Sequence, residues 1–173
     1  MDDHEASNAD GQLLPLRVWL ALFSSVKQIE AVVRTNLREA FASTLPRFDL
    51  LSQLYRSPGG LTMGEISARL MVTGGNVTGL IGRLVEEGLV DRLQDADDRR
   101  VQWVRLTPKG DKVFSSMAPA NQGWVTEAMA EMSEDDLRQL QNLLSKLKSS
   151  VANASNRSLG GAADGEMPRK SLK

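Results

Sequence analysis

The stretch from Leu61 to Gly110 constrains the fold more than any other part of the sequence. Two short helical patterns are separated by a tight turn, and two strand-like runs over 89–93 and 101–106 then flank a hydrophilic tip that ends in paired arginines. The order helix, turn, helix, strand, charged loop, strand is that of a winged helix-turn-helix. In that fold the second helix enters the major groove of DNA, and a cationic wing reaches the adjacent minor groove.

Capping residues mark where the helices of this stretch begin and end. Thr62 and Glu65 fit a capping box at the first helix. Thr73 is a plausible cap for the second helix, and Gly88 is expected to close it in the left-handed conformation. Thr107, followed by a proline, predicts a further helix start after the second strand. The buried sides of the two helices are expected to be formed by Ile66, Leu70, Val77, Leu80, Ile81, Leu84 and Val85.

Long amphipathic helices are predicted on both sides of this stretch. Apolar residues recur at helical spacing from Leu13 to Phe41, and a helix of that length exceeds what a small domain's core requires, which predicts dimerisation. A helix from Pro108 to about Met132 is expected to be kinked or interrupted at Pro119 and Gly123. A last helix starts at residues 133–136 and carries a leucine stripe, namely Leu137, Leu140, Leu144, Leu147 and Val151.

The predicted fold class is therefore mainly α with a small β-hairpin wing. Residues 1–12 are polar and predicted to be a flexible arm, and 13–45 a dimerisation helix, whereas 46–112 form a DNA-binding lobe. Residues 113–152 are expected to supply the C-terminal dimerisation helices. Residues 153–173 are small, polar and rich in glycine and alanine, so we expect a disordered tail.

The composition excludes several classes of chemistry. The chain has no cysteine and one histidine, His4, so thiolate chemistry, a zinc or iron site and a histidine-based triad lack their residues. We therefore expect no metal, no cofactor and no enzymatic activity. The acidic N-terminus and the lack of a long apolar run predict a cytoplasmic protein without a membrane span.

The second helix of the motif is the candidate recognition helix. Its exposed face is predicted to carry Thr73, Gly75, Asn76, Thr78, Gly79 and Arg83. Asn can bond two adenine atoms in the major groove, and Thr can contact a base or the thymine methyl group. Glycines at 74, 75, 79 and 82 cost roughly 1 kcal/mol each in a helix interior, and close approach of the backbone to DNA would explain them. The alternative is a weak helix tolerated by good packing.

Two roles are open for Arg83. One is a contact with a DNA phosphate, and the other is an internal ion pair with Glu86, Glu87 or a wing aspartate.

The hairpin tip holds the candidate wing residues. We assign Arg100 to the narrow, negative minor groove, Asp98 to positioning its side chain, and Arg99 to a phosphate contact. A charged, solvated turn would be the alternative if the helix-turn-helix did not precede it.

These residues resemble the MarR family of winged-helix transcriptional regulators over 46–112. The resemblance depends on Asp98 and Arg100 in the wing, on the strand 101–106 with its Thr-Pro-Lys-Gly continuation, and on the turn 86–90. It implies a homodimer built from the terminal helices, a near-palindromic operator, and release by a small effector.

Residues 47–65 and 70–80 are similar in addition to MarR-type repressors of aromatic-acid catabolism, including hydroxycinnamate regulators that respond to acyl-CoA thioesters. This similarity implies an aromatic acid or its CoA thioester as effector. The chain departs from the redox-sensing branch, since it lacks cysteine, and from the zinc-sensing branch, since it lacks histidine ligands.

In this family the effector lies between the dimer helices and the DNA-binding lobe. Candidate walls of such a site are Trp19, Phe23, Phe48, Tyr55, Met117 and Trp124. The phosphates of a CoA thioester would need cations, and Arg34, Arg38, Arg47 and Arg56 are available. The alternatives are ordinary core or dimer packing for the walls and surface positions for the arginines.

The sequence thus predicts a homodimeric DNA-binding transcriptional repressor. The alternative is a winged-helix module that binds protein without sequence-specific DNA binding, and its second helix would present an apolar face. An enzyme is disfavoured because the paired carboxylates Asp97 and Asp98 lie on a predicted exposed hairpin.

Overall fold

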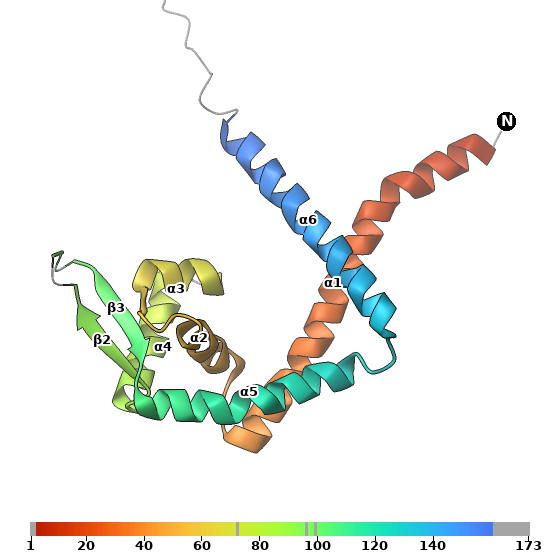
Figure 1. Cartoon of the computed structure of the whole chain (residues 1–173). Coiled ribbons are helices and arrows are strands. Elements are labelled where there is room, and N and C mark those ends of the chain that lie inside the picture. The colour runs from red at the N-terminus through yellow and green to blue at the C-terminus, as the bar shows by residue number, and fades with distance from the viewer. Residues whose placement is uncertain (1–2, 72, 96, 99, 161–173) are drawn as a thin grey trace, which may run out of the picture. The chain divides into compact units, whose positions relative to one another are not determined.

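The structure is a computed structural model that describes residues 3–71, 73–95, 97, 98 and 100–160, and side chains within 13–157 of these ranges. It divides into two compact units, Met1–Ala128 and Met129–Lys173. The elements in chain order are α1 (Asp3–Phe41), α2 (Leu45–Tyr55), β1 (Leu61–Thr62), α3 (Met63–Leu70), α4 (Gly74–Glu86), β2 (Val90–Gln94), β3 (Gln102–Leu106), α5 (Pro108–Ala128) and α6 (Glu134–Gly160) (Figure 1). The predicted fold class, mainly α with a small β wing, is confirmed.

The three strands form one small antiparallel sheet in the order β1, β3, β2. β2 and β3 make the predicted hairpin, with Val90 opposite Leu106 and Gln94 opposite Gln102. β1 was not expected, because two residues are too short to show an alternating pattern. It pairs Leu61 with Val104, so the sheet runs directly into α3.

One hydrophobic core holds the lobe together. Leu37 of α1, Leu50 of α2 and Ile81 of α4 are each completely buried, and Phe114 of α5 packs its ring against Phe48 at 5.4 Å between centroids. The helices of the lobe bury the side that their apolar spacing predicts. Val85, predicted to be buried, is instead 39% exposed, because it lies at the edge of the apolar stripe of α4. The further buried apolar side chains are Val33, Leu51, Leu54, Leu61, Ile66, Val77, Leu80, Leu84, Leu89, Val90, Val104 and Met117.

The predicted helix ends of the motif are largely confirmed. The Thr62 hydroxyl accepts from the Glu65 N–H, while the Glu65 carboxylate accepts from the Thr62 N–H at 2.8 Å. Gly88 has φ +69°, as expected for a left-handed helix end. Thr73 has the backbone geometry of a cap, but its side chain makes no capping bond. Met71, which ends α3, also has a positive φ of 53°.

The end of α4 is tied to the start of α5 at one point, which we call the Gly88 joint and define as residues 87–89 with 107–110. The Thr107 hydroxyl donates to the Gly88 carbonyl at 2.7 Å, and Lys109 Nζ donates to the Glu87 carbonyl at 2.7 Å. A Cβ added to Gly110 would lie 1.9 Å from the Leu89 carbonyl oxygen. The two backbones therefore approach as closely as a glycine permits.

Several element bounds differ from those predicted. α1 begins at Asp3, inside the segment expected to be a flexible arm, where Ala6 and Ala9 favour helix. α5 runs without interruption through Pro119 and Gly123 to Ala128, short of the expected end at Met132. Buried Met117 before these residues and the partly buried 124 and 125 after them hold the helix against the core.

α6 continues to Gly160, and residues 161–173 of the predicted tail lie outside the described residues. None of the helices in the described part of the chain has both the length and the apolar composition of a membrane span. The division into arm, lobe, dimerisation helices and tail stays a prediction.

Candidate nucleic-acid interface

The exposed face of α4 carries the residues predicted for the recognition helix. Thr73, Gly75, Asn76, Thr78, Gly79 and Arg83 are all exposed. Four apolar side chains of the same helix, Val77, Leu80, Ile81 and Leu84, are buried. The helix is therefore amphipathic, and its outer surface at the N-terminal end has only small and polar side chains.

The glycines of α4 are not required by packing within the chain. A Cβ placed on Gly74, Gly75, Gly79 or Gly82 would meet no atom within 4 Å outside its own helix and chain neighbours. By contrast, Gly60 and Gly110 each lie against backbone carbonyl oxygens. Packing within the described residues therefore does not explain the glycines on the outer face of α4.

The polar groups on this face differ in how far they are already bonded. The Thr78 hydroxyl donates to the Gly74 carbonyl at 2.9 Å, within the helix. Asn76 and Arg83 line one cavity of about 570 Å³ beside α4. Among the described residues Arg83 forms no salt bridge within 4.0 Å. Arg47 of α2 donates from both terminal nitrogens to the two carboxylate oxygens of Glu87.

The Arg47–Glu87 pair joins α2 to the end of α4. The hydrogen bond from Arg47 lowers the pKa of the Glu87 carboxyl group, and the same bond raises the pKa of Arg47. The sequence did not indicate this pair, since its residues lie 40 positions apart. From the sequence, Arg47 is predicted only as one of the cations available to CoA phosphates.

The wing presents one arginine to solvent on an ordered support. The Arg100 side chain is 91% exposed, and its Nε donates to Asp98 Oδ1 at 3.1 Å. The same oxygen accepts from the Arg100 N–H at 2.9 Å. These bonds lower the pKa of Asp98, the side-chain bond most, so the supporting carboxylate is charged at neutral pH. Arg99 lies outside the described residues.

A second wing aspartate was missed by the sequence analysis. Asp95 Oδ1 accepts from the N–H groups of Asp97 and Asp98, at 2.9 and 3.0 Å. Its Oδ2 accepts from the indole Nε1 of Trp103 at 2.7 Å. The backbone bond from Asp98 and the bond from Trp103 lower the pKa of Asp95.

The residues predicted to surround an effector are spread over several environments. Phe48 and Met117 are in the core, and Trp124 meets the edge of Phe41 at 6.2 Å. Tyr55 is half-exposed beside Phe114, at 4.8 Å. Trp19 and Phe23 stack on the exposed side of α1, at 5.8 Å. Arg34, Arg38 and Arg56 are exposed.

One cavity of about 280 Å³ lies between α1, α2 and α5, and of the predicted walls only Phe48 lines it. Its other lining residues are Val26, Ile29, Glu30, Val33, Leu45, Asp49 and Asn121. Asp49 is partly buried, and burial, followed by repulsion from Glu30, raises the pKa of its carboxyl group. The sequence does not predict this partly buried carboxylate, because a single aspartate in a short helix gives no distinct signal.

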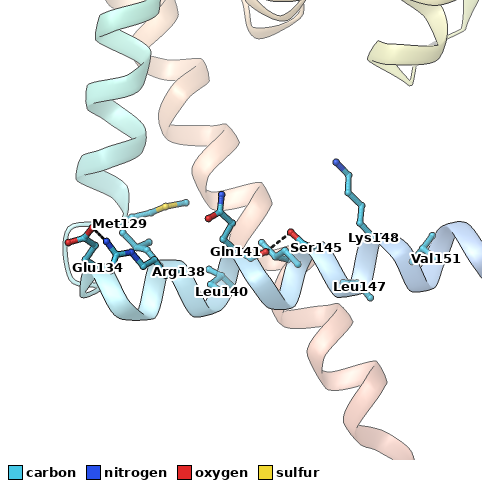
Figure 2. A pocket seen from close by; sticks show the side chains of 11 residues that line it. Met129, Glu134, Arg138, Leu140, Gln141, Ser145, Leu147, Lys148 and Val151 are labelled. Carbon is cyan, nitrogen blue, oxygen red and sulfur yellow. Dashed lines mark hydrogen bonds and ion pairs between the residues drawn. The ribbon is translucent and has the colours of Figure 1, made fainter.

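Apolar side chains also remain uncovered on α6 in the second unit. The leucine stripe and Met129 line a groove of about 880 Å³ along the helix (Figure 2). Arg138 closes one end through a bond to Glu134 at 2.6 Å. The predicted stripe is thus present as a continuous apolar surface.

The arrangement as a whole defines a class of protein. A helix-turn-helix whose second helix exposes polar and glycine residues, followed by an arginine-tipped hairpin, is a winged helix-turn-helix with the features of a DNA-binding domain.

Comparison with known proteins gives the family. Residues 44–101 match the model of the MarR family. An uncharacterised HTH-type transcriptional regulator of Bacillus subtilis, YkoM, is 32% identical over 130 residues, covering 75% of this chain and 81% of the relative. The chain belongs to the MarR family, and it is a DNA-binding transcriptional regulator.

Two solved structures show the same fold. A MarR family transcriptional regulator from Silicibacter pomeroyi is 29% identical, with a TM-score of 0.70 over 82% of this chain and 98% of the other. The MepR protein of S. aureus, in complex with DNA, is 27% identical, with a TM-score of 0.67 over 76% of this chain and 97% of the other.

Proposed function

We propose that this regulator is a homodimeric repressor that binds a near-palindromic operator and is released by a small effector. Each protomer would place α4 in the major groove and Arg100 of the wing in the adjacent minor groove. The observation that carries the proposal is the outer face of α4, where glycines that nothing in the lobe requires lie beside Asn76 and Thr78. MepR, a related protein, was solved as a DNA complex.

Close approach to DNA accounts for these glycines. Each glycine costs roughly 1 kcal/mol against alanine in a helix interior, yet an added Cβ would meet only open space within the chain. A helix backbone without Cβ atoms can lie deeper in the major groove, where Asn76 can bond an adenine edge. The same face from 73 to 79 has no large described apolar side chain, so a protein-binding module is not favoured.

Dimerisation is supported by apolar side chains that the described chain leaves uncovered. On α1, Trp19 is 57% and Phe23 52% exposed, and on α6 the leucine groove is open along its length. Surfaces of this kind mark sites of association. Two lobes related by a two-fold axis would read two half-sites about one DNA turn apart.

The glycine argument is tested by a substitution with opposite effects on stability and binding. Gly79→Ala should raise the free energy of unfolding by about 0.5–1 kcal/mol, while operator affinity falls at least about tenfold through steric contact with the groove. Gly123→Ala, on the exposed side of α5 and also in open space, should stabilise equally and leave operator affinity unchanged. If Gly79→Ala kept full affinity, the close approach would be disproved.

Two further variants test the minor-groove contact and the major-groove contact separately. Arg100→Ala should weaken operator binding substantially while the dimer stays folded, and unchanged affinity would remove the wing from the mechanism. Asn76→Ala should cost about 1–3 kcal/mol and change base preference. A uniform loss over all sequences would show that Asn76 touches only the DNA backbone.

The repressor role is tested by transcription. Footprinting on the region upstream of the protein's own gene should locate the operator, and a repressor's site would overlap the promoter. Transcription from that promoter in vitro should fall when the protein is added and recover with the effector. A rise on addition would identify an activator.

For the effector we propose an aromatic acid or its CoA thioester, with the aryl group in the cavity between α1, α2 and α5. Asp49 and Glu30 favour the thioester, because a free acid would bring a further carboxylate into a cavity that these two carboxyl groups already line. Arg38 and Arg56 are exposed and available to the phosphates, and Arg34 is exposed with its Nη2 3.9 Å from a Glu30 carboxylate oxygen.

The test is a titration of the operator complex with a hydroxycinnamoyl thioester and with the matching free acid. The thioester should release DNA at a lower concentration than the acid. Asp49→Asn should reduce the difference between the two concentrations at which DNA is released. Equal release by both compounds would refute the thioester preference.

A further inference from the structure

We infer that Asp95 and Trp103 are positioning residues for DNA binding, and that together they set where the wing holds Arg100 relative to α4. The inference rests on the proposed minor-groove role of Arg100. Neither residue needs to touch DNA for this task. Their effect would pass through the hydrogen bonds of the hairpin tip.

The Asp95 carboxylate accepts three hydrogen bonds, from donors in two parts of the hairpin. Two are the N–H groups of Asp97 and Asp98 in the tip, and the third is the indole of Trp103 on β3, eight residues away. An aspartate that only shapes a turn bonds its own backbone two or three residues on. Local turn formation therefore explains the first two bonds and leaves the bond from Trp103 unexplained.

The bonds form a continuous path from the sheet to the arginine. Trp103 donates to Asp95, and Asp95 accepts from the N–H of Asp98. The Asp98 carboxylate then accepts both the N–H and the Nε of Arg100. The tip is closed further by the Val101 N–H, which donates to the Asp98 carbonyl at 2.9 Å. The orientation of Arg100 thus depends on groups fixed to the strand below it.

Trp103 lies in the strand that connects the wing to the start of the helix-turn-helix. It lies opposite Leu93 in β2 and opposite Thr62 in β1, and Thr62 is the cap of α3. Val104, the next residue, is buried in the core, so Trp103 lies on the other face of the sheet, where the Asp95 carboxylate meets its indole. A carboxylate anchored here holds the tip in one position relative to α3 and α4. Such pre-organisation reduces the ordering that binding would otherwise require.

The first experiment compares two substitutions that remove the same charge. Asp95→Asn places an amide N–H₂ among three donors, so at least one bond of the path is lost, and operator affinity should fall about tenfold. Asp97→Asn removes an equal charge from an exposed neighbour outside this path, and should leave affinity unchanged or slightly raised, since it reduces repulsion of phosphates. Equal effects of the two variants on affinity would overturn the inference.

The second experiment is a double-mutant cycle between Trp103 and Arg100. Trp103→Phe keeps the aromatic packing and removes the indole donor, so affinity should fall about fivefold to tenfold in the otherwise natural protein. In the Arg100→Ala background the same change should cost less than about twofold, because the group that Trp103 positions is already absent. Additive losses would show a general structural role and would overturn the inference.

The cycle also separates this inference from the proposed function. If Arg100→Ala weakens binding and Trp103→Phe does not, the positioning role fails and the minor-groove role stands. If Arg100→Ala has no effect, the minor-groove role fails and the positioning role fails with it. Circular dichroism and thermal melting of each variant test whether the protein remains folded. If Trp103→Phe does not fold, Asp95→Asn tests the positioning role independently.

Discussion

The DNA-binding lobe buries its apolar side chains, whereas the terminal helices leave many of theirs exposed. In the lobe Leu50 and Ile81 are completely buried, whereas Leu144 on α6 is 41% exposed and Trp19 on α1 is 57% exposed. Apolar residues recur at helical spacing in both regions, so this spacing alone does not distinguish them. The lobe completes its core within one chain, whereas the terminal helices carry exposed apolar side chains.

The free energy that these exposed apolar side chains forgo is large enough to favour association of the protein in solution. Burying a leucine completely contributes about 1.5–3 kcal/mol, so each half-exposed leucine forgoes on the order of 1 kcal/mol. Leu144, Leu147 and Val151 of the α6 stripe and the exposed apolar side chains of α1 therefore support the proposed dimerisation. Mutations in the lobe should act on folding, and mutations in the terminal helices should act on assembly.

The largest effect is expected in the lobe at Gly110. Gly110→Ala places a Cβ 1.9 Å from the Leu89 carbonyl oxygen, and relief of this overlap must separate α5 from β2. We expect a loss of about 3–5 kcal/mol in the free energy of unfolding, measured by urea denaturation. Gly64→Ala, where an added Cβ meets nothing within 4 Å, should change it by less than about 1 kcal/mol. A mild Gly110→Ala would show that the lobe is less tightly packed than described.

The next largest effect is expected on α6, and on assembly. Leu144→Asp places a charge in the leucine groove, so the dimer dissociation constant should rise at least about 100-fold, as measured by sedimentation. Gln139→Asp adds the same charge at an exposed position outside the groove and should have little effect. A dimer that survived Leu144→Asp would show that this face is covered in some other way.

Sequence patterns predicted the parts of the fold that depend on local chemistry. The capping box of Thr62, the left-handed Gly88 and the amphipathic faces of α3 and α4 follow from residue type and spacing. They failed where packing overrode a local preference, as at Pro119, which α5 tolerates because buried residues hold it on both sides. They also failed at β1, which exists only because β3 offers it an edge.

The candidate site also has residues that the sequence predicts and residues that it does not. The outer face of α4 and the tip arginine Arg100 could be named from the sequence, because exposure follows from periodicity. The partners of Arg47, Asp95 and Asp49 could not, since each depends on which distant side chain or cavity the fold brings close.

A smaller effect should come from the ion pair between α2 and α4. Arg47→Gln should reduce the free energy of unfolding by about 0.5–1 kcal/mol at pH 7, because the pair is partly exposed and, among the described residues, Arg47 Nε is buried without a partner. Arg47 lowers the pKa of Glu87 below its ordinary value of 4.5. The pair's contribution is therefore complete above that value and is lost as the pH falls through the lower pKa of the folded state.

Chemical denaturation of the natural protein and Arg47→Gln at pH 7, 5.5 and 3 measures this dependence. The difference between the two proteins should be the same at pH 7 and 5.5 and smaller at pH 3. A difference that persisted unchanged at pH 3 would contradict the assignment of the pair.

The smallest effect is expected where α1 ends and the lobe begins. Ala42 has φ +48°, a left-handed conformation that costs a residue with a Cβ about 1 kcal/mol. Ala42→Gly should therefore raise the melting temperature by a few degrees, in line with about 0.5–1 kcal/mol. The substitution should leave the dimer dissociation constant unaltered, and a change in that constant would show that this turn belongs to the assembly surface.

The Gly88 joint gives the lobe a mechanical property. Because the Leu89 carbonyl accepts the Thr107 N–H and lies against Gly110, the foot of α5 has no room to slide past the end of α4. A ligand that displaces α5 is therefore expected to displace α4 with it. In the proposed dimer, such a tilt in each protomer would move both α4 helices relative to the DNA and release the operator.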